Sequence, residues 1–345
     1  MPEPFKVLQI GFGTIGGPIA KAIIERENLE LMAVIDVNPD LHGKSVEEIM
    51  SIDSETSTVI HSSIDAALGK DQTSPPDVAL VMTLSDLEKV SPTIIQCLSV
   101  GMHVVSICEE LSYPFERHPE LSKKIDAVAR DAGKAVLGTG INPGYLMDLL
   151  PIVSTAPLQQ VDTIHVTRVI DSAKRRASFQ KKVGTSMSED EFKVAIENKV
   201  ITGHVGLVES MRMISDALGM ELDHFEEFPP EAIIASEETV TSFATVEAGK
   251  VLGLKSRGIA EKNGKTIITL DFIAHAGASP EFDEIEIEGY PNLTQRIEGG
   301  VMGDYGTAAM AMNMIPLVAQ SPPGLYTMKD LPVPRNTQRF WKNSD

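Results

Sequence analysis

The first forty residues have the pattern of a strand, a glycine-rich turn, a helix and a second strand that ends in an acid. Residues 7–10 form a short apolar run, and Gly11-Phe-Gly-Thr-Ile-Gly16 follows at once. An apolar helical stretch covers residues 19–24, and a second apolar run over residues 31–35 closes on Asp36. This order is typical of the first βαβ unit of a dinucleotide-binding domain.

Each glycine of the turn has a mechanical role in such a unit. Gly11 allows the tight turn, Gly13 lets the backbone approach a pyrophosphate, and Gly16 packs the helix against the strand. The free N–H groups at the helix N-terminus favour an anion. Asp36 lies about twenty residues past Gly16, the spacing expected of a carboxylate that binds ribose hydroxyls. The cofactor contacts predicted from this motif are Gly11, Gly13, Thr14, Ile15, Gly16 and Asp36.

Asp36 also bears on which dinucleotide binds. A carboxylate at this position hydrogen-bonds a ribose 2′-OH and repels a 2′-phosphate, which favours NAD. No arginine follows it, because the next residues are Val37, Asn38 and Pro39. NAD is therefore the expected cofactor. Lys44 lies close enough in sequence to reach a phosphate, so use of NADP stays open.

Composition narrows the class of protein. The 345 residues are enough for two domains, each with its own core. The net charge of −19 argues against binding to nucleic acid or to a membrane surface, since both need a basic face. Cys97 and Cys108 are the only cysteines and form no CxxC pair, so neither a disulfide scaffold nor a metal site is expected. The first strand begins too early for a signal peptide, and no run of about eighteen apolar residues occurs, which favours a cytoplasmic protein.

The expected organisation changes near residue 151. Over residues 1–150 strands and helices alternate, which predicts an α/β Rossmann dinucleotide-binding domain whose parallel sheet is covered on both faces. Residues 151–302 predict an α+β substrate and dimerisation domain built on a mostly antiparallel sheet. Residues 303–345 predict a C-terminal helix and a proline-rich tail that return to the first domain.

Two local patterns in the second domain make sharper predictions. Asn263-Gly264, set between two alternating strands, is a strong signal for a type I′ hairpin turn. Residues 240–248 are expected to form one continuous strand.

Polar residues that follow the strands of the first domain are candidates for chemistry, because ligands of open parallel sheets bind beyond the carboxyl ends of the strands. The candidates are Thr83, Ser85, Cys108, Glu109, Glu110, Thr139 and Asn142. Two adjacent carboxylates directly after a buried strand are costly unless they are paired or wet. The pair Glu109-Glu110 therefore indicates an active site, although a solvated loop is the alternative. Adjacent side chains point in different directions, so we expect only one of the two to enter a cleft.

Two further candidates in this domain have structural alternatives. The glycines of Gly138-Thr-Gly-Ile-Asn-Pro-Gly144 suggest backbone lying close to a ligand around Asn142, or else a structural loop. Cys108 is a possible nucleophile, but no helix N-terminus or cationic neighbour that would lower its pKa is visible, so a small buried residue is the favoured interpretation.

The second domain contains a basic cluster in an otherwise acidic chain. This cluster could bind a substrate carboxylate or a cofactor phosphate, and the alternative is an interface or a solvated edge. Its members are Arg168, Arg175, Arg176, Lys181 and Lys182. His204, at the start of an expected helix, is a candidate substrate contact whose alternative is a structural histidine.

Taken together, these residues resemble a known family. The segments HVVSICEELSYP, GTGINPGYLMD, GHVGLVESMRMI and GDYGTAAMAMNMIPLVAQSPPGLYTMKDLP resemble the 2,4-diaminopentanoate dehydrogenases and the related native amine dehydrogenases, which share a dihydrodipicolinate-reductase-like N-terminal domain. The resemblance runs from about Phe5 to Pro334. It implies NAD(P)-dependent oxidative deamination of an amine, or reductive amination of a ketone with ammonia, in a homodimer. It also implies a catalytic glutamate in the Glu109-Glu110 segment, with Glu109 preferred, and an aromatic position at Tyr145 that flanks the substrate pocket.

Two rival functions remain at this point. A dihydrodipicolinate-reductase-like enzyme would reduce a C=N or C=C bond, but the HHxxK-like segment expected in its second domain is not found. A non-catalytic NAD-binding regulatory protein would keep the fold, and the carboxylate pair argues against it.

Overall fold

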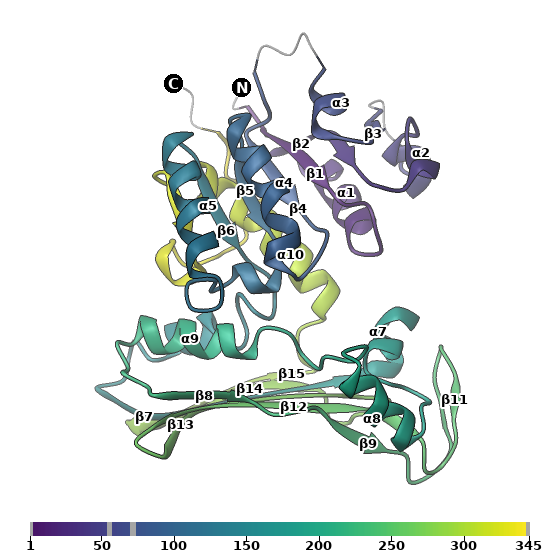
Figure 1. Cartoon of the computed structure of the whole chain (residues 1–345), viewed down its shortest axis with the longest axis vertical. Helices are drawn as coiled ribbons and strands as arrows, with labels where there is room; N and C mark the ends of the chain where they lie inside the picture. Colours follow the sequence, from purple (N-terminus) through teal and green to yellow (C-terminus); the bar gives the residue numbers. More distant parts are fainter. Residues whose placement is uncertain (1–2, 54–56, 70–73, 343–345) are drawn as a thin grey trace. The chain divides into compact units, whose positions relative to one another are not determined.

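The computed structural model describes residues 3–53, 57–69 and 74–342, and the chain divides into two compact units. One unit spans Met1–Tyr145 together with Gly303–Asp345, and the other spans Leu146–Met302. Figure 1 labels most of the helices and strands of the two units. None of the described helices has the length and apolar character needed to cross a bilayer.

The first unit is built on a parallel sheet with the strand order β16-β6-β5-β4-β1-β2-β3. Every strand pair in it is parallel. The order reverses between β1 and β4, which makes this the switch point where a Rossmann sheet binds its ligand. The predicted α/β Rossmann domain is confirmed. Its strands are β1 (Phe5–Ile10), β2 (Leu29–Ile35), β3 (Ile60–His61), β4 (Val78–Val81), β5 (His103–Ser106), β6 (Ala135–Gly138) and β16 (Gly324–Tyr326).

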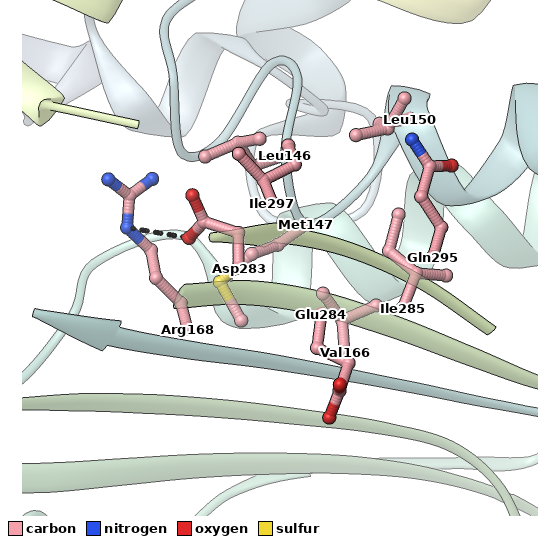
Figure 2. Close-up of a pocket in the computed structure, with 10 residues that line it drawn as sticks. All are labelled: Leu146, Met147, Leu150, Val166, Arg168, Asp283, Glu284, Ile285, Gln295 and Ile297. Carbon is pink, nitrogen blue, oxygen red and sulfur yellow. Dashed lines mark ion pairs between the residues drawn. The ribbon is translucent and has the colours of Figure 1, made fainter. Parts of the chain in front are cut away.

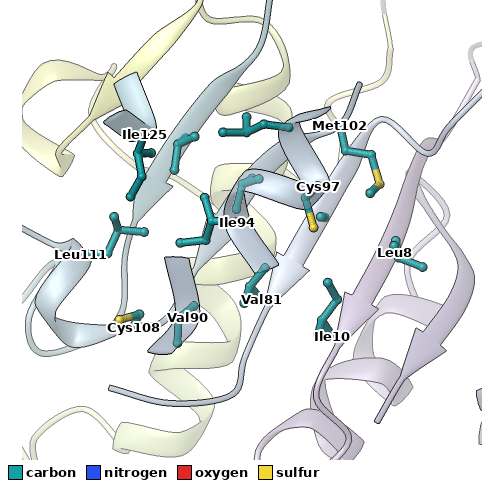
Figure 3. Close-up of a cluster of buried hydrophobic side chains, with 14 of the residues drawn as sticks. Leu8, Ile10, Val81, Val90, Ile94, Cys97, Met102, Cys108, Leu111 and Ile125 are labelled. Carbon is teal, nitrogen blue, oxygen red and sulfur yellow. The ribbon is translucent and has the colours of Figure 1, made fainter. Parts of the chain in front are cut away.

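Helices cover both faces of this sheet, as a parallel sheet requires. Helices α4 and α5 pack together on one side, and α1 and α10 contact each other on the other. Figure 3 shows the core that the sheet forms with α4 and α5, where Ile94 and Ile125 lie among strand residues such as Val81. The helices of this unit are α1 (Gly16–Ile24), α2 (Val46–Met50), α3 (Ile64–Leu68), α4 (Leu87–Ser99), α5 (Pro119–Asp131) and α10 (Gly303–Ala319), with 3-10 turns η1 (Pro39–Leu41), η2 (Glu109–Leu111) and η4 (Met328–Asp330).

Within the first unit, side-chain amides fix the C-terminal segment to elements from the start of the chain. Asn28 Nδ2 donates to the carbonyls of Thr337 and Phe340, both at 2.9 Å. Asn313 Oδ1, on α10, accepts from Thr337 N at 3.2 Å and from Arg26 Nη1 at 3.1 Å. These bonds hold the tail against the elements at the start of the chain.

The second unit is built on a mixed sheet with the strand order β15-β14-β7-β13-β12-β8, and β9 also pairs with β12. Only the β7–β13 pair is parallel within this described sheet, so the predicted mostly antiparallel α+β domain is confirmed. Asn263 and Gly264, with φ of 53° and 74°, join β12 to β13. Two positive φ angles are what a type I′ turn requires. The strands are β7 (Gln160–Asp171), β8 (His224–Glu227), β9 (Glu231–Ile234), β12 (Val251–Lys262), β13 (Lys265–His275), β14 (Phe282–Tyr290) and β15 (Leu293–Glu298).

One face of this sheet is covered by helices. Alternate residues of β7, from Ile164 to Ile170, are buried, and α9 packs against β8, β12 and β13. At the other end, Phe192 of α8 lies in a core cluster with Phe272 of β13. The helices are α6 (Leu149–Ser154), α7 (Ala177–Lys182), α8 (Glu189–Glu197) and α9 (Leu207–Ala217), with a 3-10 turn η3 (Ser172–Lys174).

The prediction of one strand over residues 240–248 is wrong. Two short strands, β10 (Thr239–Val240) and β11 (Thr245–Val246), pair with each other instead. Thr241 Oγ1 accepts from the backbone N–H groups of Phe243 and Ala244, both at 3.0 Å. Hydroxyl side chains stabilise turns in this way, and here the turn interrupts an otherwise strand-like sequence.

Candidate active site

The glycine turn after β1 leaves one side open to a ligand. Gly11 has φ of +104°, and a Cβ there would lie 2.3 Å from the carbonyl oxygen of Met82. A Cβ at Gly16 would lie 2.3 Å from the carbonyl oxygen of Gly11, whereas a Cβ at Gly13 would meet nothing within 4 Å. Gln9 Nε2 braces the turn by donating to the carbonyls of Gly11 and Gly16, at 2.9 and 2.8 Å. The open side therefore lies at Gly13, as close approach of a pyrophosphate would require.

The acid at the end of β2 is anchored beside this turn. Asp36 Oδ2 accepts from Phe12 N at 2.6 Å, and Oδ1 accepts from Asn38 N at 2.8 Å. Within the described residues, the backbone N–H groups of Gly13, Thr14 and Ile15 donate to no other backbone group. Free amides at a helix N-terminus next to a fixed carboxylate fit a dinucleotide. Lys44 is exposed.

The segment after β4 lies against the glycine turn and against the segment after β5. Thr83 is exposed, and its Cγ2 lies 3.4 Å from the position of a Cβ on Gly11. Cys108 is buried, and its Sγ donates to the carbonyl of Ser85 at 3.1 Å. Burial raises the pKa of the Cys108 thiol to about 12. Cys108 therefore stays a thiol at neutral pH, which favours the interpretation as a small buried residue over a nucleophile.

The two adjacent glutamates have opposite environments. Glu110 is 8% exposed, and its Oε2 accepts from Leu87 N and faces His118 Nε2, both at 2.9 Å. Its Oε1 lies 3.0 Å from Arg117 Nη2. Glu109 is half-buried, and its carboxylate has no hydrogen-bond or ion-pair partner among the residues that the structure describes. One glutamate is thus engaged by the protein, while the other is available to a ligand.

The glycine-rich segment after β6 packs on the turn that carries these glutamates. A Cβ at Gly138 would lie 2.5 Å from the backbone carbonyl of Leu111. The close approach at Gly138 is therefore to the chain's own η2 turn, which is a structural role. Farther along, the buried Thr139 Oγ1 and both polar atoms of the Asn142 side chain have no hydrogen-bond partner in the described structure. Buried polar atoms without partners are costly, so they point to a ligand that satisfies them. Tyr145 is half-buried.

The second unit contains a cavity of about 170 Å³ with a buried arginine in its wall. Arg168 is 2% exposed; its Nη2 donates to the Val301 carbonyl, and its Nε lies 3.4 Å from Asp283 Oδ1. Figure 2 shows this ion pair. Arg168 Nη1 is buried with no hydrogen-bond partner among the described residues, and Arg175 lines the same cavity. Burial lowers the pKa of the Arg168 guanidinium and raises that of the Asp283 carboxyl.

The other basic residues of the predicted cluster are separate from this cavity. Lys181 and Lys182 are exposed on α7, and Arg176 immediately precedes that helix. His204 stacks on Phe272, with ring centroids 4.5 Å apart. Burial, with the nearby charges of Lys182 and Arg168, lowers the pKa of His204 to about 3, so the ring is neutral at ordinary pH. This stacking supports the structural alternative, and the substrate contact predicted for His204 stays a prediction.

Comparison with known proteins assigns the chain to a family. A family profile described as the 2,4-diaminopentanoate dehydrogenase C-terminal domain matches residues 145–343, more than half of the chain. The 2,4-diaminopentanoate dehydrogenase of Acetoanaerobium sticklandii is 32% identical over 339 residues, which cover 96% of this chain and 95% of that protein. The chain belongs to the 2,4-diaminopentanoate dehydrogenase family.

More distant relatives of the family agree in name and in fold. An amine dehydrogenase of Streptomyces virginiae is 23% identical over 350 residues, covering 94% of this chain and 95% of that protein. The solved structure of an amine dehydrogenase from Mycobacterium smegmatis has a TM-score of 0.81 at 20% identity, covering 97% of this chain and 98% of that one, and it shows the shared fold. Since both curated relatives are named dehydrogenases of amines, the predicted enzyme class, an NAD(P)-dependent oxidoreductase acting on CH–NH2 donors, is confirmed.

Three residues of the candidate site, Asp283, Arg117 and His118, were not predicted from the sequence. Asp283 lies at a buried position of the alternating strand β14, so its inward orientation was readable from that alternation. Arg117 and His118 carried no such signal, because only the fold brings them to Glu110.

Proposed function

We propose that this enzyme deaminates a short amine that carries a carboxylate, such as 2,4-diaminopentanoate, or aminates the matching ketone with ammonia. The observation that carries the proposal is the half-buried Glu109 carboxylate, which has no protein partner in the described structure while Glu110 beside it is fully engaged. Glu109 follows β5 at the edge of the sheet where Rossmann domains bind the nicotinamide end of their cofactor.

The residues that would hold the cofactor are Gly11, Gly13, Thr14, Ile15, Gly16 and Asp36 in the glycine turn and β2, with Thr83, Cys108 and Asn142 after the later strands. A dinucleotide held by these residues would supply the acceptor for the hydride that leaves the amine carbon. The free amides of Gly13 to Ile15 suit the pyrophosphate, and the unsatisfied amide of Asn142 suits a polar group of the ligand. NAD is the preferred form, because Asp36 places a negative charge where NADP has its 2′-phosphate.

Glu109 would act as the general base. An amine must lose a proton before its carbon can give up a hydride, and a carboxylate near a cationic amine binds the ammonium and accepts that proton. Once that proton has passed to solvent, the same carboxylate can take a proton from the water that attacks the resulting iminium carbon. Transfer of this proton to the nitrogen of the carbinolamine lets ammonia leave as the ketone forms. Its lack of a competing protein partner supports this role, since Glu110 would have to break three contacts to do the same.

Arg168 would recognise the substrate's carboxylate, with Arg175 beside it. A guanidinium with one buried unpartnered N–H group, in the wall of a cavity of about 170 Å³, is suited to a charge-assisted hydrogen bond with an anion. Tyr145 and His204 are proposed to contribute to the substrate pocket through their rings. The homodimer, which the family resemblance implies, and the cytoplasmic location expected from the sequence are further proposals.

The test is the kinetics of Glu109→Gln, with Glu120→Gln as the matched control because Glu120 is an exposed surface glutamate on α5. Initial rates of NAD⁺ and NADP⁺ reduction are measured with 2,4-diaminopentanoate and with cyclohexylamine. General acid–base catalysis contributes about 10²- to 10⁴-fold, so Glu109→Gln should lose that much turnover while its affinity for NAD⁺ stays unchanged.

Three outcomes would contradict the proposal. A loss of less than about tenfold in Glu109→Gln would remove Glu109 from the reaction. Silence of the parent enzyme with both amines, together with reduction of a C=N compound, would identify an imine reductase instead. Cofactor binding without any turnover would identify a regulatory protein.

A further inference from the structure

The buried partner of the catalytic candidate has its own set of contacts. Glu110 contacts three residues from two segments of the first unit through its carboxylate. Leu87 N, at the first residue of α4, and His118 Nε2 both meet Oε2, while Arg117 Nη2 meets Oε1. Three donors around one carboxylate are more than a solvated loop residue collects.

We propose that Glu110 is a positioning residue, which locks the η2 turn and thereby aims the Glu109 carboxylate at the substrate. The proposal rests on the role of Glu109 given above. Glu110 itself would not touch the substrate, because its oxygens are already held by protein groups.

The backbone of the turn is held from the same directions. Glu110 N donates to the Ser85 carbonyl at 3.4 Å, in the loop where Cys108 Sγ also bonds. Ser112 Oγ donates to the Glu109 carbonyl at 2.7 Å. On another side the backbone of Leu111 lies against Gly138 of β6, too close for any Cβ at that glycine. The η2 turn is therefore fixed to the loop after β4 and to β6.

The geometry of a 3-10 turn converts the orientation of Glu110 into that of Glu109. Such a turn has three residues per revolution, so neighbouring side chains diverge by about 120°. With Glu110 drawn inward by α4 and by the Arg117-His118 segment, Glu109 is directed away from that interior. If the Glu110 carboxylate were released, the turn would keep its backbone contacts but lose the side-chain contacts that set its orientation, and the direction of the Glu109 carboxylate would be less closely fixed.

The contacts require a carboxylate rather than a side chain of similar size. All three partners are donors, and glutamine presents one acceptor oxygen and one donor NH2 group in place of two acceptor oxygens. Glu110→Gln therefore loses at least one contact, and its NH2 group faces an N–H donor of the protein instead of accepting a hydrogen bond from it. His118→Asn, by contrast, removes one partner and leaves the carboxylate in place.

The experiment compares Glu110→Gln, His118→Asn and their double variant in the full-length enzyme, with Glu109→Gln and the surface control Glu120→Gln alongside. The measurements are kcat for 2,4-diaminopentanoate, the dissociation constant for NAD⁺ by calorimetry, and the pH profile of kcat. A displacement of about 1 Å in a reacting group costs on the order of 100-fold in rate. We expect Glu110→Gln to lower kcat by about 10- to 100-fold, with NAD⁺ affinity within about threefold of the parent and the acidic limb of the pH profile retained.

The double variant separates positioning from two independent effects. Because both residues act through one turn, Glu110→Gln/His118→Asn should be no slower than Glu110→Gln alone, whereas independent effects would multiply. If Glu110→Gln does not fold, His118→Asn carries the test and should show a smaller loss of kcat with unchanged NAD⁺ affinity.

Several results would overturn the inference. A kcat in both single variants within about twofold of the parent would show that the contacts do not direct Glu109. A loss in Glu110→Gln as large as that in Glu109→Gln, with the acidic limb abolished, would make Glu110 the base itself. Full activity of Glu109→Gln would instead refute the proposed function, and this outcome is distinct from the other two.

Discussion

Substitution of Arg168 tests its proposed recognition of a substrate carboxylate, but this must be separated from its contribution to the stability of the second unit. Arg168 is buried, and its Nε lies 3.4 Å from Asp283 Oδ1. Removal of one partner of a buried ion pair destabilises a protein by about 3–5 kcal/mol, because the other charge is left buried. Among the residues that the structure describes, Asp283 would retain only the hydrogen bond from Val301 N, at 2.7 Å. The single variant Arg168→Met is therefore expected to be unstable.

The double variant Arg168→Met/Asp283→Asn removes both charges and keeps an acceptor for Val301 N. Its stability should lie closer to that of the parent, and its kinetics can then be measured. A hydrogen bond to a charged group contributes about 1.5–3 kcal/mol, which corresponds to roughly 10- to 150-fold in kcat/KM. We expect the double variant to lose that much kcat/KM for 2,4-diaminopentanoate and little for cyclohexylamine, which has no carboxylate.

The assay is the ratio of kcat/KM for the two amines at saturating NAD⁺. Asp283→Asn is the matched control, because it keeps Arg168 and should retain the preference for the carboxylate-bearing amine. It also breaks the buried ion pair, so its rates are normalised to the fraction of folded enzyme. An unchanged ratio in the double variant would refute the assignment of Arg168 to the carboxylate. An equal loss with both amines would place Arg168 in the framework of the second unit alone.

Two further predictions concern the first unit. Asp36→Ala should raise KM for NAD⁺ by about 10-fold and shift the cofactor preference toward NADP⁺, since it removes the carboxylate that repels a 2′-phosphate. Steady-state rates with NAD⁺ and with NADP⁺ measure this preference. An unchanged ratio of kcat/KM for the two cofactors would mean that Asp36 does not face the ribose. His103 Nδ1 accepts from Ala135 N at 3.1 Å, and burial lowers the pKa of this histidine from 6.5 to about 4. Because the unfolded chain binds the proton more readily, the stability that His103 contributes is complete above about pH 6.5 and falls by up to about 3 kcal/mol as the pH drops to about 4. Urea unfolding followed by the fluorescence of Trp341, the single tryptophan, should show this loss in the parent and not in His103→Asn; parallel pH curves for the two proteins would contradict it.

Much of the fold was predictable because its signals are local. The strand, glycine turn, helix and acid at the start of the chain specify a βαβ unit within about thirty residues. Asn263 and Gly264 specify their hairpin because few residues accept two positive φ angles. The strand expected over residues 240–248 failed for an equally local reason, since the hydroxyl of Thr241 competes for the backbone and forms a turn.

The candidate site was predictable as a list of residues, not as a set of roles. The motif after β5 placed two carboxylates at the ligand-binding edge of the sheet, but the two are chemically identical in sequence. What separates them is contributed by residues 87, 117 and 118, whose donors surround Glu110 and leave Glu109 without a partner in the described structure. In the same way, only burial distinguishes Arg168, with its unsatisfied N–H group, from the exposed Lys181 and Lys182.

The sequence by itself therefore determined the Rossmann unit, the mostly antiparallel second unit and the positions of the candidate residues, because backbone propensity, side-chain alternation and turn chemistry act over short stretches of chain. The folded structure shows which glutamate is held by protein donors and which is available, and which arginine lies in the wall of a cavity. Those distinctions depend on desolvation and on which neighbouring side chains and backbone groups the fold turns toward each residue, and a short stretch of sequence does not specify either.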